Sequence, residues 1–224
     1  MAAVALLNAE AGSTPSGTGS FTYFTNFRVS VENLAFAKSV GIWGHNQLSG
    51  NWVFFPCSFD HSVSGNNEIW QSHVSEVQID QFDVVYQVAG NTYWDNNAGF
   101  NFTLDTAAAQ TDGVGTAIVL PNVLNVASSI DPSGKLSVQA LVKNLAFAKQ
   151  VAIVYSIDGW ITFHNVFGSF EQIFPPSTTP HQVQSELWSV TTSLSPGASG
   201  QFAVFYIVNG ATYWDNNFGA NYLF

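Results

Sequence analysis

Two short motifs rich in aromatic and amide side chains occur twice in this chain. Thr92-Tyr-Trp-Asp-Asn-Asn97 recurs as Thr212-Tyr-Trp-Asp-Asn-Asn217, and each copy continues through a glycine to Asn101 or Asn221. A flat indole can stack on the apolar C–H face of a sugar ring, while Asn and Asp supply donors and acceptors for its hydroxyl groups. The motif therefore favours carbohydrate recognition. The alternative is turn formation by Asp-Asn-Asn beside a packed tryptophan.

The second motif combines an aromatic ring with a lysine. Asn33-Leu-Ala-Phe-Ala-Lys38 recurs letter for letter as Asn144-Leu-Ala-Phe-Ala-Lys149. On a strand, residues two apart share a face, so each phenylalanine would lie beside its lysine. This predicts a second patch for a ligand, and a solvated lysine at a strand end is the alternative. Glu68 and Glu186 are further repeated acids.

The spacing of the motifs indicates a duplication. One pair is 111 positions apart (144 − 33) and the other 120 (212 − 92). A unit of about a hundred residues can bury its own core. We therefore predict two homologous domains, 1–105 and 114–224, joined by a linker at 106–113. Ala3-Val-Ala-Leu-Leu-Asn8 aligns with Ala117-Ile-Val-Leu-Pro-Asn122, which predicts the first strand of each copy.

Short runs of β-branched and aromatic residues, broken at Gly, Asn, Pro and Ser, predict strands. The clearest runs cover residues 21–32, 38–43, 78–88, 136–142, 150–156 and 202–208. The dipeptide Asn209-Gly210 is typical of a tight turn, so the sequence before each Tyr-Trp predicts a hairpin. No amphipathic helix of convincing length is found. Frequent strands and turns favour an all-β chain of antiparallel sandwiches.

Composition restricts the partners. Of 224 residues, 46% are hydrophobic and only 9% charged, and the net charge is −10 with five basic residues. This disfavours nucleic acid and anionic membranes and suits neutral, hydroxyl-rich ligands. No apolar run is long enough for membrane insertion, and no signal peptide is recognised, so we expect a cytoplasmic or non-classically secreted protein. The single Cys57 lies among aromatic residues, which predicts an inert packed thiol.

The sequence offers little for catalysis. The repeated acids are Glu68 with Glu186 and Asp95 with Asp215, whereas a glycosidase needs two carboxylates that face each other across a cleft. The five histidines have no counterparts at matched positions and no metal-ligand spacing. No glycine loop for phosphate is present. We therefore predict a non-enzymatic protein without a metal or cofactor.

Taken together, these motifs resemble carbohydrate-binding module family 21, found as the starch-binding module of some fungal glucoamylases and the glycogen-targeting domain of protein phosphatase 1 regulatory subunits. The resemblance rests on Asn-Leu-Ala-Phe-x-Lys, a loop tryptophan and the terminal Tyr-Trp-Asp-Asn-Asn-x-Gly-x-Asn-Tyr, and it covers the chain twice. It implies two tandem immunoglobulin-like antiparallel β-sandwich domains. It also implies two α-glucan surfaces on each.

The resemblance implies which residues form these surfaces. The first surface combines the loop tryptophan, the turn motif and the later asparagine: Trp52, Trp94, Asp95, Asn96, Asn97 and Asn101, then Trp160, Trp214, Asp215, Asn216, Asn217 and Asn221. The second surface uses the early motif and a glutamate: Asn33, Phe36, Lys38 and Glu68, then Asn144, Phe147, Lys149 and Glu186. A third tryptophan pair, Trp70 and Trp188, is predicted to be core.

The chain also departs from the family pattern. Two aromatic positions of the family are lost in both copies, one to Asp83 and Ala203 and the other to Asn67 and Ser185. An amide of the family is replaced by Ala98 and Phe218. In addition, the first copy has Phe102 where the second has Tyr222. Both surfaces are therefore expected to offer fewer ligand contacts than in the family, so the preferred glycan could differ from starch.

These observations predict a non-catalytic, lectin-like binder of oligo- or polysaccharides, most simply α-glucans, that is multivalent through two modules and could form a homo-oligomer. One alternative is a glycogen-targeting adaptor of a protein phosphatase. That role needs a docking motif of basic-Val-x-Phe type, and Arg28-Val-Ser-Val31 lacks the phenylalanine. Another alternative is a starch-binding accessory of an amylolytic enzyme.

Overall fold

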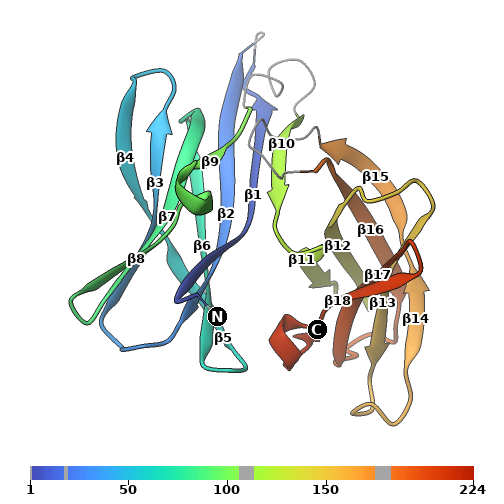
Figure 1. Cartoon of the computed structure of the whole chain (residues 1–224). Coiled ribbons are helices and arrows are strands. Elements are labelled where there is room, and N and C mark those ends of the chain that lie inside the picture. The colour runs from blue at the N-terminus through green and yellow to red at the C-terminus, as the bar shows by residue number, and fades with distance from the viewer. Residues whose placement is uncertain (1, 18–19, 106–113, 175–182) are drawn as a thin grey trace. The chain divides into compact units, whose positions relative to one another are not determined.

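The computed structural model describes residues 2–17, 20–105, 114–174 and 183–224. Within them the chain is built from strands, apart from two single-turn 3₁₀ helices, η1 (Asn97–Gly99) and η2 (Asn217–Gly219) (Figure 1). Contacts divide it into a first unit, which comprises Met1–Leu120 together with a segment that begins at Phe174, and a second unit, which comprises Pro121–Ile173 and Val183–Phe224. The predicted all-β, antiparallel class is confirmed. The predicted linker, 106–113, lies outside the described residues.

The first unit contains two antiparallel sheets. One has the order β10 (Val114–Val119), β1 (Val4–Pro15), β2 (Phe21–Glu32), β6 (Asn67–Ser75) and β5 (Ser58–Val63). The other has the order β4 (Asn51–Pro56), β3 (Lys38–Asn46), β7 (Ile79–Val88) and β8 (Asn91–Asp95), with the short β9 (Phe102–Thr103) also paired to β7. Inward-facing residues of both sheets, such as Phe27 and Ile42, meet in one core.

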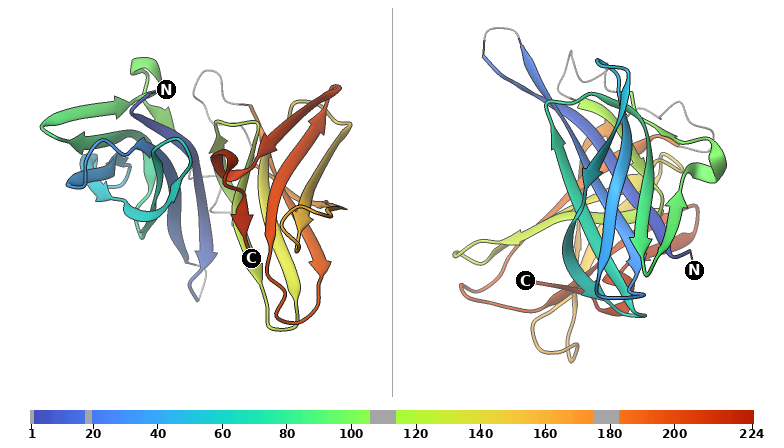
Figure 2. Two further views of the ribbon diagram at one scale, coloured as in Figure 1. Left: turned by 90° about the horizontal axis from the view of Figure 1, so that it is seen from below. Right: turned by 90° about the vertical axis from the view of Figure 1, so that its left-hand side faces the viewer.

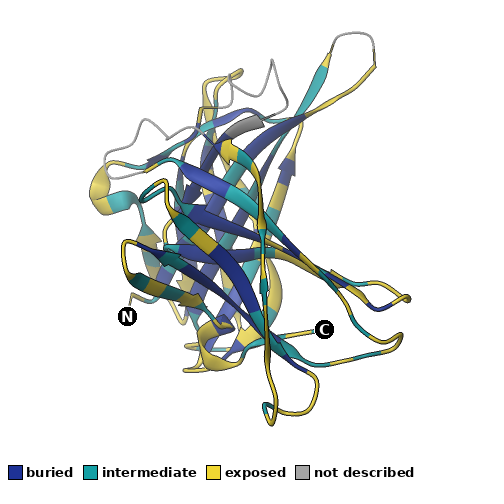
Figure 3. Ribbon diagram, turned by 90° about the vertical axis from the view of Figure 1, so that its right-hand side faces the viewer, coloured by how far each residue is buried: buried dark blue, intermediate teal, exposed yellow. Residues whose placement is uncertain are grey.

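The second unit is built in the same way. One sheet has the order β11 (Val123–Ile130), β12 (Lys135–Lys143), β16 (Ser185–Ser193) and β15 (Ser169–Phe174). The other has the order β14 (His164–Phe167), β13 (Lys149–Ser156), β17 (Gln201–Val208) and β18 (Ala211–Asp215), with the short β19 (Tyr222–Leu223) also paired to β17. Figure 2 shows the sheets from two further directions. Val138 and Ile153 belong to its core. Buried residues lie mainly in the central strands, whereas β4, β5, β14 and β15 and most connections are largely exposed (Figure 3). The immunoglobulin-like character of two tandem domains stays a prediction.

Local sequence signals located the central strands and their turns. Five of the six predicted runs lie within strands, the run at 78–88 begins one residue before β7, and the run at 21–32 coincides with β2. The hairpins β7–β8 and β17–β18 turn at Ala89-Gly90 and Asn209-Gly210, and all four residues have positive φ. Two consecutive left-handed residues form the tight turn that matches strand twist. The predicted hairpins are therefore confirmed.

The predicted match between Ala3–Asn8 and Ala117–Asn122 is wrong. β10 pairs with β1 and is an edge strand of the first unit, although we placed residue 114 at the start of the second domain. The strand equivalent to β1 is β11, because the backbone N–H of Leu6 donates to Asp95 at 2.7 Å and that of Asn125 donates to Asp215 at 2.6 Å. Both donors lie beside a β-bulge. Alternating apolar residues suit any strand, so they did not identify the partner.

The lone thiol is part of the packing. Cys57 is 8% exposed, and desolvation by burial raises its pKa to about 12. The thiolate, which is the reactive form, is therefore scarce at neutral pH. The prediction of an inert thiol is confirmed.

Candidate functional site

The tryptophans of the turn motif stand on the outer faces of their sheets. Tyr93 and Tyr213 pack against the two cores. Because strand side chains alternate, the next residues, Trp94 and Trp214, point outwards. They are 50% and 55% exposed. Both indoles are therefore accessible for stacking.

The aspartates of the turn motif act within the fold. The Asp95 carboxylate accepts the Leu6 N–H and so connects β8 to β1. Asp215 accepts the Asn125 N–H, and the Tyr222 hydroxyl donates to its two oxygens at 2.9 and 2.8 Å. Charge-assisted bonds of this kind are strong. The aspartates link the two sheets of each unit, and their contact with a sugar stays a prediction.

The asparagines that follow form the turn itself. Asn96 caps η1, accepting the Gly99 N–H at 3.0 Å, and Asn97 is left-handed (φ 52°) and donates its amide to the carbonyl of Asn101 at 3.0 Å. The same bonds join Asn216 to Gly219 and Asn217 to Asn221 in the second unit. Turn formation, the alternative to recognition, therefore describes what these amides do in the structure. Sugar binding by them is a prediction.

The loop tryptophans are not equivalent, contrary to the prediction. Pairing of Gly41 with Pro56 corresponds to pairing of Ala152 with Phe167, because β3 and β13 begin at the repeated lysines. Counting back four residues from Pro56 and from Phe167 gives Trp52 and Phe163. Trp160 therefore lies three residues before the position of Trp52. Trp52 is 37% exposed on β4, whereas Trp160 lies in a turn with φ 69°.

The turn that carries Trp160 is held by Asp158. The side-chain and backbone groups of Thr162 and the Ser156 hydroxyl donate to this carboxylate, which lowers its pKa to about 2. The Trp160 N–H donates to the Ser156 oxygen at 2.8 Å. These bonds fix the indole before any ligand arrives, and pre-organisation of this kind reduces the ordering cost of binding.

Gln201 joins residues of the first surface in the second unit. Its side-chain oxygen accepts the Trp160 indole N–H at 2.6 Å and the Asn221 amide at 3.3 Å. A hollow of about 360 Å³, lined in part by Trp160, Gln201 and Phe224, lies beside them. Sequence reasoning missed Gln201, since a glutamine at a strand start carries no distinctive signal. Trp214, on the sheet face, instead contacts Phe205, with ring centroids 5.2 Å apart.

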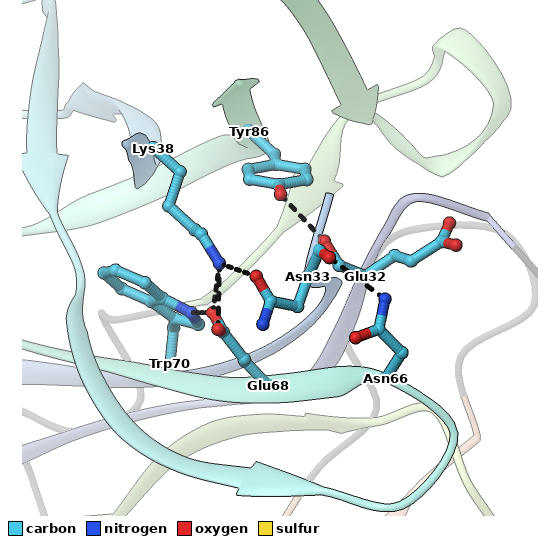
Figure 4. A network of polar contacts seen from close by, with 7 residues as sticks. All are labelled: Glu32, Asn33, Lys38, Asn66, Glu68, Trp70 and Tyr86. Carbon is cyan, nitrogen blue, oxygen red and sulfur yellow. Dashed lines mark hydrogen bonds and ion pairs between the residues drawn. The ribbon is translucent and has the colours of Figure 1, made fainter. Parts of the chain in front are cut away.

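The second surface contains a buried ion pair. In the first unit, Lys38 Nζ donates to Asn33 Oδ1 at 2.5 Å and to both Glu68 oxygens at 2.8 Å, and the Trp70 indole N–H donates to Glu68 Oε2 at 3.0 Å (Figure 4). The lysine and glutamate side chains are only 5% and 9% exposed. The alternative of a solvated lysine is therefore wrong.

The second unit repeats this network. Lys149 Nζ donates to Asn144 at 2.5 Å and to Glu186 Oε1 at 2.6 Å, and the Trp188 indole N–H donates to Glu186 Oε2 at 2.9 Å. A charge removed from water must be fully paired, and these partners pair it. Trp70 and Trp188 are half-buried against the cores rather than wholly inside them.

The phenylalanines of the early motif are exposed, whereas their lysines are buried. Phe36 and Phe147 are each at 101% of the reference area, and the lysine side chains are 5% and 3% exposed. Both phenylalanines precede the strands that begin at the lysines, so the predicted shared strand face is wrong. In the second unit, Phe147 and Lys149 nevertheless line the same groove. The network instead anchors the base of a loop whose ring is presented to solvent.

An aromatic groove surrounds the second surface in the second unit. It has a volume of about 530 Å³, and its lining includes Phe147, Phe170, Ile173 and Trp188 beside the ion pair. Phe170 meets Trp188 edge to face, with centroids 6.1 Å apart, as Phe59 meets Trp70 at 5.9 Å in the first unit. Phe59 and Phe170 were missed because each lies alone in a weakly patterned strand. Ligand sites commonly have this size and this mixture of rings and fixed polar groups.

Other chemistry finds little support in the described ranges. They contain no group of three or more His, Cys, Asp and Glu side chains placed to hold a metal ion. No helix in the same ranges is long and apolar enough to span a membrane. Glu68 and Glu186 are engaged by lysine, and Asp95 and Asp215 by backbone N–H groups. The repeated carboxylates thus have structural partners.

Comparison with known proteins finds a family match over part of the chain. Residues 118–224 match the carbohydrate/starch-binding module (family 21). The chain is 31% identical over 88 residues to glucoamylase 1 of Rhizopus oryzae, covering 38% of this chain and 15% of that protein. It is 31% identical over 103 residues to glycogen-binding subunit 76A of Drosophila melanogaster, covering 45% and 14%. It thus spans only a small part of these relatives.

Two solved structures are also similar. The starch-binding domain of Rhizopus oryzae glucoamylase, in complex with β-cyclodextrin and maltoheptaose, is 31% identical, with 47% of this chain and 95% of that chain covered and a TM-score of 0.37. The carbohydrate-binding module of the muscle glycogen-targeting subunit of protein phosphatase 1 is 23% identical, with 46% and 74% covered and a TM-score of 0.36.

Proposed function

We propose that this chain is a non-catalytic, lectin-like protein that binds α-glucans through both of its units. The observation that carries the proposal is the exposure of Trp94 and Trp214, the same residue of the same turn motif in each unit, at 50% and 55%. An indole that packs only for stability would be covered. The family match over residues 118–224 supports a glucan as the ligand, and the low charge of the chain agrees with a neutral one.

Each surface would contribute different contacts. On the first surface of the second unit, Trp214 lies beside Phe205, which in turn meets Phe167 at 6.3 Å. Phe205 is only 6% exposed, so Trp214 and Phe167 would stack on the C–H faces of sugar rings while Phe205 supports them from below. On the second surface, Phe147 and Phe170 would hold a glucan chain in the groove. The Lys149–Glu186 pair behind it is a positioning element that fixes the loop of Phe147.

Two units on one chain would bind more tightly than one. The strands β10 and β11 belong to different units and are separated by residues 120–122. A short tether raises the effective concentration of the second unit once the first has bound, and avidity can then gain roughly 10²–10⁴-fold, geometry permitting. The proposal therefore expects polysaccharides to be held much more tightly than short oligosaccharides.

Hydrolysis is not expected. A glycosidase needs one carboxylic acid and one carboxylate on either side of a glycosidic bond. Glu186 is tied to Lys149 and Trp188, and Asp215 to Asn125 and Tyr222. Incubation of the chain with soluble starch should therefore release no reducing sugar.

The test replaces both exposed indoles. Trp94→Ala with Trp214→Ala should weaken binding to maltoheptaose and soluble starch at least about tenfold, because each ring supplies about 0.5–1.5 kcal/mol beyond its buried area. Isothermal titration calorimetry measures the affinity, and differential scanning calorimetry measures Tm. The control, Leu48→Ala, removes an exposed side chain that belongs to neither surface and should leave affinity unchanged. Unaltered binding by the tryptophan variant, or its unfolding, would contradict the proposal.

A second candidate is a glycogen-targeting adaptor of a protein phosphatase. It is favoured by the similarity to glycogen-binding subunit 76A over 45% of this chain. Such an adaptor would bind glycogen and the phosphatase at once. Pull-down of the purified catalytic subunit of protein phosphatase 1 on glycogen, with and without this chain, separates this candidate from a free-standing lectin.

A further inference from the structure

The outer face of one sheet in the first unit carries more aromatic rings than the first surface requires. Ile42, Phe55 and Val84 pack into the core. Strand alternation therefore places their neighbours on the outer face of the β4-β3-β7-β8 sheet. Four of these are large aromatic residues, each 37–50% exposed: Trp43, Trp52, Phe54 and Trp94.

Strand register brings these side chains into one patch. Trp43 lies directly opposite Phe54, and Trp52 lies opposite His45, two residues along β3 from Trp43. Trp94 lies opposite Val85, which lies opposite Gly41. Neighbouring strands are about 5 Å apart, so the patch extends roughly 14 Å across four strands. We call Trp43, Trp52, Phe54 and Trp94 the aromatic platform.

The absence of a side chain at Gly41 lets the ring of Phe54 lie close to the sheet. A Cβ atom at this position would lie 2.3 Å from the ring of Phe54, so the ring rests directly on the backbone of β3. Val85 faces outwards on the next strand and yet is only 5% exposed, because it is covered by its neighbours. The result is a broad, shallow apolar surface, in contrast to the groove of the second unit.

The second unit lacks the platform. The register places Val154 and Asn165 at the positions of Trp43 and Phe54, and Ala152 at that of Gly41. Its outer face keeps the exposed rings of Phe167 and Trp214 on either side of the covered Phe205, and Phe163 takes the position of Trp52. The repeated motifs alone therefore do not explain Trp43 and Phe54.

We propose that the aromatic platform binds the flat surface of an insoluble, neutral polysaccharide, where several parallel chains present their sugar rings side by side. This inference rests on the proposed function and deepens it. A groove encloses one soluble chain. Rings spread over four strands can instead stack on the C–H faces of adjacent chains at once. The platform is continuous with Trp94, so it enlarges the first surface into a two-dimensional one.

Charge favours this occupant over others. Asp83 lies within the same face, opposite Trp43, and Asp95 and the His45–Asp80 pair lie close by. The chain as a whole carries a net charge of −10. A second copy docked face to face about a two-fold axis would bring Asp83 against the Asp83 of its partner. An acidic polymer would be repelled as well, whereas a neutral glycan surface meets no such penalty.

The experiment measures soluble and insoluble ligands in parallel. The full chain and Trp43→Ala with Phe54→Ala are sedimented with granular starch, microcrystalline cellulose and chitin, and their affinity for maltoheptaose is measured by calorimetry. The variant should be retained roughly tenfold less on the insoluble polysaccharide that the parent binds, since two stacking rings are lost. Its affinity for maltoheptaose should stay within about twofold, because Trp94, Trp214 and the groove, which the proposed function assigns to soluble glucan, are untouched. Val154→Ala with Asn165→Ala is the matched control and should change neither value.

A gentler variant guards against loss of folding. Gly41→Ala keeps every ring but lifts that of Phe54, so retention should fall severalfold while Tm shows that the chain is folded. The inference would be overturned if the parent chain bound none of the three solids, or if the parent and Trp43→Ala with Phe54→Ala were retained equally. A dimer in sedimentation velocity that Trp43→Ala with Phe54→Ala dissociates would also overturn it. Failure of the parent to bind maltoheptaose would instead overturn the proposed function.

Discussion

The two units share a hydrogen-bonded framework and differ in their aromatic surfaces. The Lys–Glu–Asn–Trp network recurs with nearly the same distances, 2.8 Å from Lys38 to Glu68 and 2.6 Å from Lys149 to Glu186. The aspartate that holds the bulged strand recurs as well. By contrast, Trp43 has Val154 at its place, and Trp160 has moved three residues from the position of Trp52.

This difference shows which kind of residue is retained in the repeated motifs. Members of a buried network depend on one another, because removal of one leaves its partner unsatisfied inside the protein. Exposed rings carry no such constraint and can be exchanged singly. Most residues that agree between the copies therefore hold each unit together, and the exposed pairs Phe36 with Phe147 and Trp94 with Trp214 are the exceptions. We expect the aromatic residues that differ between the two units to determine which glycan each unit prefers.

The largest effect is expected from breaking the buried ion pair. Lys149→Met leaves Glu186 without its cation in a site where the glutamate side chain is 9% exposed, and this should reduce the free energy of unfolding by about 3–5 kcal/mol. Lys38→Met should do the same in the first unit. Urea unfolding of the full chain, followed by tryptophan fluorescence, measures both.

A double variant separates charge from packing. Lys149→Met with Glu186→Met removes both charges and should recover most of the lost stability, because a buried pair replaced by apolar groups is often neutral. If Lys149→Met alone costs less than about 1 kcal/mol, the lysine is solvated and the shared framework is not what stabilises the units.

A smaller effect should separate the two aspartates. Tyr222 donates to Asp215, but its counterpart in the first unit is Phe102, paired in the same way with β7. The rings lie alike, stacked at 5.2 Å on Phe202 and at 5.3 Å on Phe82. Tyr222→Phe should therefore cost about 1.5–3 kcal/mol, the range for a hydrogen bond to a charged group. Thermal unfolding checks this.

The reciprocal change sharpens the comparison. Phe102→Tyr places a hydroxyl where it can reach Asp95 and should stabilise the first unit by about 0.5–1.5 kcal/mol. Loss of stability in this variant would mean that the surroundings of Phe102, which is 2% exposed, have no room for the oxygen.

Local patterns predicted the strands well because they act over a few residues. Alternation fixed the run at 21–32, and the turn at Asn209-Gly210 follows from the ease with which both residues take positive φ. Local patterns did not predict which distant segments pair with each other. The residues of β10 resemble those of β1, yet β10 lies beside β1 rather than in its place in the second unit.

The candidate site was predictable in position and less so in role. The exposed indole of Trp214 agrees with its place in an alternating strand after the core residue Tyr213. The burial of Lys38 was not foreseen, because its partner Glu68 is 30 residues away and only the folded sheet brings them together. The shift of Trp160 was hidden because the paired positions Gly41 and Pro56 are as far apart in sequence as Ala152 and Phe167. Its geometry depends on Asp158 and Gln201, which no motif marks.

The smallest expected effect concerns a position that differs in charge. Asp83 lies on the outer sheet face where the second unit has Ala203, and burial, together with the charge of Asp95, raises the pKa of Asp83 to about 6. Between its usual value of 3.8 and 6, the folded chain holds more protons than the unfolded one. The free energy of unfolding contributed by this group therefore falls as pH rises through that window.

Asp83→Asn should remove this dependence. Its Tm should exceed that of the parent by a few degrees at pH 7, and the two should converge below about pH 3, where Asp83 is protonated in both states. Calorimetry at several pH values measures the difference. His45→Gln is the control for the other ionisable group opposite this strand, which is paired with Asp80. Ala203→Asp should install the same pH dependence in the second unit. If Asp83→Asn leaves the profile unchanged, water solvates this carboxylate fully, and the outer faces of the two units differ in rings but not in electrostatics.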